Sequence, residues 1–237
     1  MEVAGVRLVI DHVTASSPSW SLTANGVFSL GVHLISGDVG SGKSTLALMM
    51  AGLRAPECGT VTREGISRMM LSFQFPEFHV TGLSIEEECR SWNLDPEEVI
   101  RSVNIGVTGV TPVLSLSRGE LKRLHLTCIL ARNYDLLLLD EPFSSLDCAE
   151  KEKICQKMSL RSSGITVLFT HEQSVFPHVD HIWEIVDGRL TDCGDMPGAI
   201  ERWQHAPPLV KKLVSTGRTP RELTPEGIRE AACRTHE

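Results

Sequence analysis

Residues 37–45, GDVGSGKST, combine the glycines, the lysine and the hydroxyl groups that a phosphate-binding loop needs. The pattern GxxxxGK[ST] lies between the apolar run VHLIS and the run STLALMM, a predicted strand and a predicted helix. Glycines let successive backbone N–H groups turn toward phosphate oxygens, and the helix start adds its dipole. The stretch therefore predicts a nucleoside triphosphate site, with Lys43 at the β- and γ-phosphates and Ser44 on Mg²⁺. The predicted nucleotide-binding residues here are Gly37, Asp38, Val39, Gly40, Ser41, Gly42, Lys43, Ser44 and Thr45.

A second set of reactive side chains follows four leucines in YDLLLLDEPFSSLD, residues 134–147. Asp140 comes directly after this predicted strand, at the edge where ligands bind in open α/β sheets. We expect its carboxylate to lie opposite Ser44 and to hold Mg²⁺ through the metal's water shell. Glu141 is the candidate that polarises the attacking water. The alternative, two solvated charges that merely end a strand, does not account for the phosphate loop in the same chain.

The stretch LSRGE, residues 116–120, is the predicted start of a helix with Ser117 at its end. Free N–H groups at a helix start accept either a side-chain oxygen or a phosphate, so a cap and an anion site share the same chemistry. The pentapeptide alone does not distinguish these two roles.

The elements that would position these residues alternate along the chain. Apolar runs bounded by turn residues (GVHLIS, RMMLSF, DLLLLD, ITVLFT) are separated by helical patterns, which indicates an α/β fold with a mostly parallel sheet covered on both faces. The first strand is expected within MEVAGVRLVIDHV, residues 1–13.

The segment from about 77 to 133 has no such strands and predicts a small helical insertion. Within it, Asp95 is the expected N-cap of a helix that begins at Pro96, with Glu98 completing a capping box. From residue 205 the tail turns polar, with a helix capped by Thr224 and begun by Pro225.

Composition excludes several classes of protein. The 237 residues carry a net charge of −7, which argues against a nucleic-acid partner. Neither a signal-peptide pattern nor an uninterrupted apolar run of about 18 residues is found, so we expect a soluble chain. Seven scattered cysteines without a CxxC pair indicate reduced thiols in a cytoplasmic protein.

Over residues 1 to about 200, these motifs together resemble the ATPase subunit of an ATP-binding cassette (ABC) transporter. The resemblance implies an α/β phosphate-loop NTPase core (residues 1–204) with a mostly parallel sheet flanked by helices, an antiparallel β edge and a helical subdomain at about 77–133. A helical extension at 205–237 would complete the chain.

The resemblance also assigns further residues. Gln74 in LSFQFPE would contact Mg²⁺ or water, and His171 in LFTHE would contact the γ-phosphate. LSRGE matches the family signature LSGGQ, whose serine and second glycine, here Ser117 and Gly119, contact the nucleotide held by a second ATPase subunit. Asp147 would lie in a loop that faces that subunit. The implied ligands are ATP and Mg²⁺.

Two positions depart from the family pattern. Arg118 replaces the first signature glycine, and we expect it to point away from the nucleotide, while Glu120 replaces the glutamine. The residue that would stack on adenine falls near Ser16 or Ser17 in VTASSPSW. Trp20, the nearby aromatic residue, either takes that role or packs under the loop.

The FQFPE stretch and the tail PPLVKKLVSTGRTPRELTPEGI resemble the ATPases of energy-coupling factor importers, which take up vitamins or transition-metal ions. In that group a transmembrane coupling subunit would dock near Phe75–Phe78, and the ATPase would lie on the cytoplasmic face of the membrane. An exporter or lipid-handling ATPase is the alternative within transporters, and a non-transport ABC ATPase is the alternative outside them.

Overall fold

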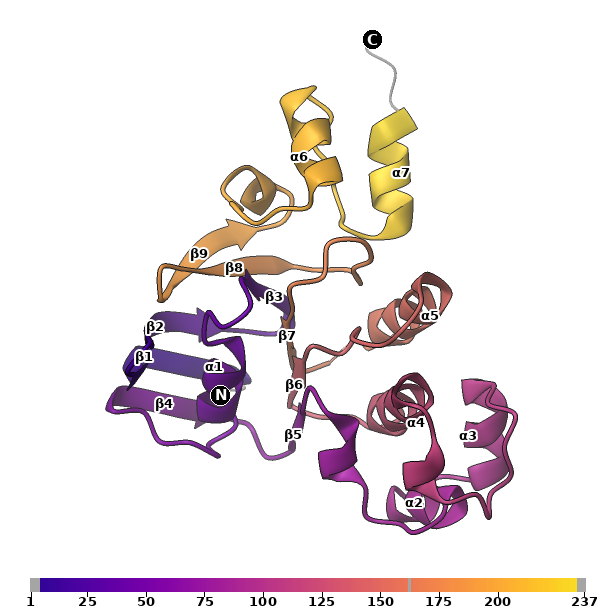
Figure 1. Cartoon of the computed structure of the whole chain (residues 1–237). Helices are drawn as coiled ribbons and strands as arrows, with labels where there is room; N and C mark the ends of the chain where they lie inside the picture. Colours follow the sequence, from indigo (N-terminus) through magenta and orange to yellow (C-terminus); the bar gives the residue numbers. More distant parts are fainter. Residues whose placement is uncertain (1–4, 162, 234–237) are drawn as a thin grey trace.

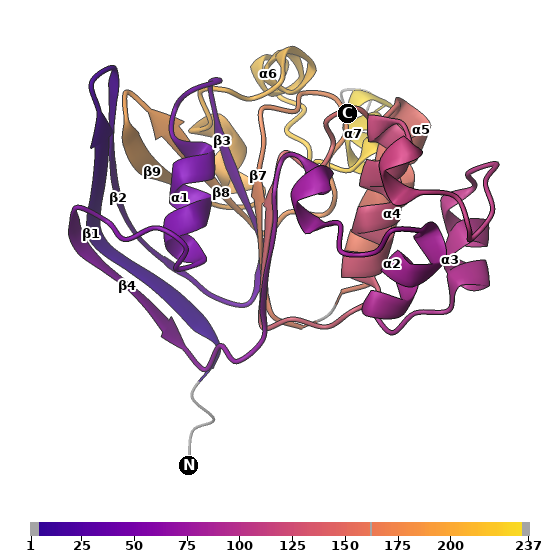
Figure 2. The ribbon, with the colours of Figure 1, turned by 60° about the horizontal axis from the view of Figure 1, so that its bottom comes forward.

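A mixed nine-stranded sheet runs through the part of the chain that the computed structural model describes, residues 5–161 and 163–233, in the order β4-β1-β2-β9-β8-β3-β7-β6-β5. Helix α1 (Lys43–Met50) covers one face, and α4 (Arg118–Leu130) and α5 (Cys148–Ser159) cover the other (Figures 1 and 2). Each face therefore has its own buried apolar cluster.

Five neighbouring strands form the parallel centre of the sheet. These are β8 (His181–Val186), β3 (Gly31–Gly37), β7 (Ile165–Phe169), β6 (Leu136–Asp140) and β5 (Met69–Ser72). Every residue of β6 and β7 is buried, as expected for strands covered on both faces.

The other side of the sheet is largely antiparallel. Strands β1 (Arg7–Ser17), β2 (Trp20–Phe28) and β4 (Cys58–Glu64) pair antiparallel, and β9 (Arg189–Asp195) joins them to β8. The predicted fold class, a mostly parallel core with an antiparallel edge, is confirmed. The predicted first strand begins at Arg7, and residues 1–4 of that prediction lie outside the described residues.

The predicted helical insertion contains η1 (Pro76–His79), α2 (Ile85–Ser91), α3 (Pro96–Val103), η2 (Val113–Ser115) and α4. Its apolar side chains, among them Ile85, Val99 and Leu124, form a third buried cluster of their own. Helix α4 also carries Leu126 and Ile129 into the cluster beneath the sheet, so it belongs to both cores.

Asp95 caps α3 as predicted, because its carboxylate accepts the N–H groups of Glu97 (2.8 Å) and Glu98 (3.1 Å). The expected capping box is wrong, since the Glu98 side chain does not return a hydrogen bond to the Asp95 backbone. One exposed carboxylate at the cap satisfies both free donors, which leaves Glu98 in solvent.

The tail from residue 205 packs against the core. After η3 (Gly198–Glu201), helix α6 (Pro208–Ser215) buries Val210, and Leu223 is buried just before α7 (Pro225–Cys233). The predicted Thr224 cap is confirmed, because its hydroxyl accepts the Gly227 N–H at 3.1 Å. Residues 234–237 of the predicted extension lie outside the described residues.

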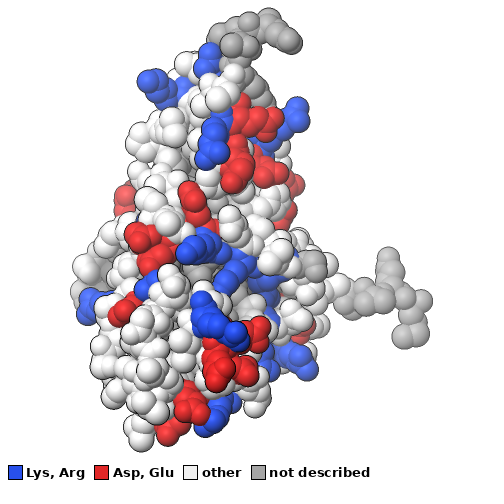
Figure 3. Space-filling view, turned by 90° about the vertical axis from the view of Figure 1, so that its right-hand side faces the viewer, with Lys and Arg blue, Asp and Glu red and all other residues white. Residues whose placement is uncertain are grey.

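Of the described helices, none combines the length and the apolar character that crossing a bilayer requires. The seven cysteines are all free thiols, as expected from their scatter. On the face shown in Figure 3, lysine and arginine side chains gather near the middle, with acidic side chains above and below them.

Replacing Asp95 with alanine should lower the free energy of unfolding by about 1 kcal/mol, because two N–H groups at the start of α3 lose their acceptor. Chemical denaturation measures the change. Glu98→Gln on the same turn is the matched control and should stay within about 0.5 kcal/mol. Equal losses in the two variants would show that the cap contributes nothing specific.

Candidate active site

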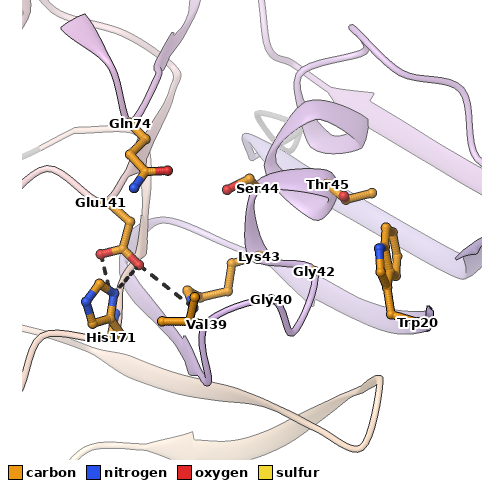
Figure 4. Close-up of a pocket in the computed structure, with 10 residues that line it drawn as sticks. All are labelled: Trp20, Val39, Gly40, Gly42, Lys43, Ser44, Thr45, Gln74, Glu141 and His171. Carbon is orange, nitrogen blue, oxygen red and sulfur yellow. Dashed lines mark hydrogen bonds and ion pairs between the residues drawn. The ribbon is translucent and has the colours of Figure 1, made fainter. Parts of the chain in front are cut away.

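The candidate active site lies where four parallel strands end side by side. The phosphate loop (residues 37–45) follows β3, His171 follows β7, Glu141 follows β6 and Gln74 follows β5 (Figure 4). Because parallel neighbours present their carboxyl ends at one edge of the sheet, residues distant in sequence meet there.

The phosphate loop is a strand–loop–helix turn, as the sequence predicts. Gly42, at the N-cap of α1, has φ 102°, a conformation that side chains rarely adopt. Lys43 is only 6% exposed, and its Nζ donates to the carbonyl oxygens of Gly37 (2.8 Å) and Asp38 (3.0 Å). Burial lowers the pKa of Lys43, and the nearby Glu141 carboxylate opposes that shift. The loop thus curls around a buried cation.

A cavity of about 270 Å³ opens in front of this loop. Nine of the predicted site residues line it, together with Trp20: Val39, Gly40, Gly42, Lys43, Ser44, Thr45, Gln74, Glu141 and His171. Seven predicted residues are not among its lining residues. Four of them, Gly37, Asp38, Ser41 and Asp140, belong to the phosphate loop or directly precede Glu141, and the other three are Ser117, Gly119 and Asp147.

Glu141 is held by residues that directly follow the adjacent strand β7 and by the phosphate-loop lysine. Its carboxylate accepts from the Thr170 hydroxyl (3.1 Å), lies 2.7 Å from Nδ1 of His171 and 3.8 Å from Nζ of Lys43. Its backbone has φ 47°, and its N–H donates to the Phe169 carbonyl oxygen at 2.9 Å. The side chain is therefore fixed facing the cavity. Thr170 was not predicted, and its position just before His171 was the available signal.

Asp140 lies behind Glu141 at the end of β6. Its Oδ1 is buried without a hydrogen-bond partner among the described residues. Burial raises the pKa of Asp140, and the Ser44 hydroxyl opposes that shift. Asp140 itself does not line the cavity, whereas Ser44 and Gln74 do. The unpaired Asp140 oxygen, the Ser44 hydroxyl and the Gln74 side-chain carbonyl are oxygen ligands of the kind that Mg²⁺ prefers. These residues fit the predicted metal.

The signature, residues 116–120, begins α4. The Ser117 side chain accepts the Glu120 N–H (3.3 Å), and the Ser117 backbone N–H donates to the Glu120 carboxylate (2.9 Å), which makes a complete capping box. The Ser117 hydroxyl also donates to that carboxylate (2.7 Å). These bonds lower the pKa of Glu120. A Cβ on Gly119 would lie 2.7 Å from the Ser145 carbonyl oxygen, so the close approach of the two segments requires glycine there.

Arg118 is not among the residues that line this cavity, and its expected orientation away from the nucleotide of a facing chain stays a prediction. Its guanidinium lies 5.8 Å from the centre of the Phe75 ring, and its Nε is 3.7 Å from the Glu77 carboxylate. Trp20 both lines the cavity and packs against the apolar cluster on the α1 face, so each of its two proposed roles has a contact that supports it. Ser16, near the expected adenine position, instead donates its hydroxyl and its N–H to Glu57.

A phosphate loop follows β3, and two carboxylates stand at the end of β6, which β7 separates from β3 in the sheet. This arrangement defines the chain as a phosphate-loop nucleoside triphosphatase. A search of protein families matches residues 27–144 to the family described as ABC transporter. Together with the relatives that follow, this match shows that the chain belongs to the ABC transporter family and is an ATPase of the ABC type.

Among curated proteins, the chain is 30% identical over 200 residues to the energy-coupling factor transporter ATP-binding protein EcfA1 of Thermotoga maritima, covering 75% of this chain and 77% of that protein. It is 33% identical over 164 residues to ABC transporter F family member 3 of Arabidopsis thaliana, of which it spans only 22%.

Among solved structures, a bacterial Atm1-family ABC exporter with ATP bound matches 86% of the chain at a TM-score of 0.67 and 20% identity. The match covers 42% of that exporter chain, and at this identity it supports the fold alone.

Replacing Asp140 with asparagine should weaken Mg²⁺ binding in the presence of ATP by about 10- to 100-fold, because the unpaired oxygen loses its charge. Affinity for ATP without metal should be retained, since Lys43 and the loop are untouched. Calorimetric titrations with and without Mg²⁺ measure both quantities. Asp135→Asn, just before the other end of β6, is the control, and an equal loss there would contradict a metal role for Asp140.

Proposed function

We propose that this chain binds and hydrolyses ATP as one half of an ATPase dimer that drives a membrane partner. The observation that carries the proposal is the incomplete site: the cavity gathers the phosphate loop, Gln74, Glu141 and His171, while the capped helix start at Ser117 lies outside it. A second ATPase subunit, identical or related, would supply Ser117 and Gly119 to close the cavity over ATP.

In this proposal, residues of one chain hold the substrate and its metal. Lys43 neutralises the β- and γ-phosphates, and the N–H groups at the start of α1 bind their oxygens. Ser44, Gln74 and Asp140 would hold Mg²⁺, which supplies charge neutralisation between the β- and γ-phosphates when bound.

Glu141 then orients the attacking water and accepts its proton as the bond to the γ-phosphorus forms and the bond to the leaving ADP oxygen breaks. Thr170 and His171 hold the Glu141 carboxylate in place for this step. Loss of the γ-phosphate removes the contact between the two chains, so the dimer opens and the opening acts on the membrane partner.

Replacing Glu141 with glutamine should reduce the rate of phosphate release by about 10²- to 10⁴-fold, because a neutral amide cannot accept the proton. ATP binding should be retained, and a dimer should accumulate when ATP and Mg²⁺ are added, which size-exclusion chromatography with light scattering detects. A hydrolysis rate equal to that of the wild type would remove Glu141 from the reaction. A monomer at saturating ATP would contradict the dimer.

We further propose that the membrane partner is the coupling subunit of an energy-coupling factor importer for a vitamin or a transition-metal ion. Two exposed rings support this docking site: Phe78 is 73% exposed, Phe75 is 43% exposed, and their centroids lie 6.2 Å apart directly after Gln74. The similarity to EcfA1 supports the same assignment. The chain would then work at the cytoplasmic face of the membrane.

Purification of the tagged chain from gently solubilised membranes should recover a small transmembrane protein, and the double variant Phe75→Ala, Phe78→Ala should lose it. Leu160→Ala is the matched control, since Leu160 is 84% exposed at the end of α5, away from this loop. Mass spectrometry identifies the partner. An exporter subunit in its place would support the alternative transporter class, and recovery of soluble proteins alone would contradict the transporter assignment.

A further inference from the structure

One face of the signature helix α4 contacts the segment that carries Gln74. Three cationic or aromatic side chains, Arg118, Lys122 and His125, are spaced i, i+4, i+7, which places them on the same side of a helix. Each contacts a different part of residues 73–79.

Lys122 makes the central contact. It is only 1% exposed, and its Nζ donates to the Gln74 carbonyl oxygen at 2.6 Å and to that of Phe73 at 3.5 Å. Burial lowers its pKa to about 8, although Asp140, Glu77 and Glu141 oppose that shift. Burying an ammonium group is costly even when carbonyl oxygens satisfy it. A methionine of similar length would fill this space without that cost, so packing alone does not account for a lysine here.

The other two contacts flank this one. The His125 ring stacks on the His79 ring with centroids 4.2 Å apart, and Nε2 of His79 accepts the Phe73 N–H at 3.0 Å. Burial lowers the pKa of His79 to about 4, which leaves its ring neutral and able to accept that bond. Arg118, the exposed member of the three, contacts Phe75 and Glu77. Solvent screens exposed ion pairs of this kind, so the Arg118 contact is the weakest of the three.

We propose that Lys122 is a positioning residue that ties Gln74 to the helix beginning at Ser117, so that this helix start and the Gln74 backbone move as one unit. The inference rests on the proposed function. Gln74 lines this chain's own cavity, whereas Ser117 would meet the nucleotide of the facing chain. Lys122 lies five positions, about 7.5 Å along the helix axis, after Ser117. Because the buried Lys122 ammonium group is bonded to the Gln74 carbonyl oxygen, a movement of Ser117 on closure at one nucleotide would also move Gln74 at the other nucleotide.

The test compares Lys122→Met, which removes the donor, with Lys122→Gln, which keeps a neutral donor. Lys157→Met is the matched control. Lys157 is a half-buried helical lysine whose pKa burial also lowers, but it donates to the Thr127 hydroxyl on another face of α4. Two quantities are measured: kcat and KM for ATP, and hydrogen exchange of the peptide covering residues 71–79 without nucleotide.

We expect Lys122→Met to lower kcat about tenfold or more while KM changes less than about twofold, and to speed exchange in residues 71–79. Lys122→Gln should fall between it and the wild type, and Lys157→Met should match the wild type. If Lys122→Met fails to fold, the kcat and the exchange rate of Lys122→Gln are compared with those of Lys157→Met instead.

Two results would overturn the inference. One is unchanged exchange in residues 71–79 of the Lys122 variants, and the other is a kcat for them equal to that of Lys157→Met. A wild-type chain that hydrolyses no ATP would instead refute the proposed function. Because the exchange measurement needs no nucleotide, it would still test the contact between Lys122 and Gln74.

Discussion

The parallel alignment of β3, β7, β6 and β5 is the constraint on which the rest of the molecule depends. It brings the carboxyl ends of four strands to one edge, so the phosphate loop, His171, Glu141 and Gln74 share a cavity although they span about half of the chain. The apolar clusters on both faces fix that alignment, because a strand buried on each side cannot slide without exposing its side chains. The cores on the two faces thus hold the ends of these strands in register.

The same edge collects buried charge. Lys43, Lys122, Asp140 and Glu141 are each less than 10% exposed, two cations and two anions on neighbouring elements. Each burial is unfavourable alone, but the groups offset one another, and an unpaired oxygen on Asp140 remains. An arrangement that leaves a buried oxygen without a partner favours binding over stability, which is typical of a functional site.

Helix α4 connects the two parts of the molecule. It contributes to the small core of the helical subdomain and to the cluster beneath the sheet, and its N-terminal turn holds the capped Ser117. A helix shared by two cores transmits a rotation of one part to the other more directly than a loop would. The contacts of its Arg118, Lys122 and His125 with residues 73–79 give that transmission a path to Gln74.

The sequence by itself determined the local features of this protein. Features that depend on residues close together in the chain could be predicted from motif spacing and apolar periodicity. These features are the phosphate loop, the buried strand before Asp140, the α/β class and the helix caps at Asp95, Ser117 and Thr224. Tertiary structure alone decided that Thr170 holds Glu141, that Arg118 lies over Phe75 and that Lys122 is buried against Gln74. These contacts join segments about 29 to 48 residues apart, and no local pattern specifies which distant backbone a side chain will meet. Local patterns also have a limit, as Glu98 shows. The capping pattern predicted a bond from its side chain to the Asp95 backbone, but the folded geometry does not form that bond.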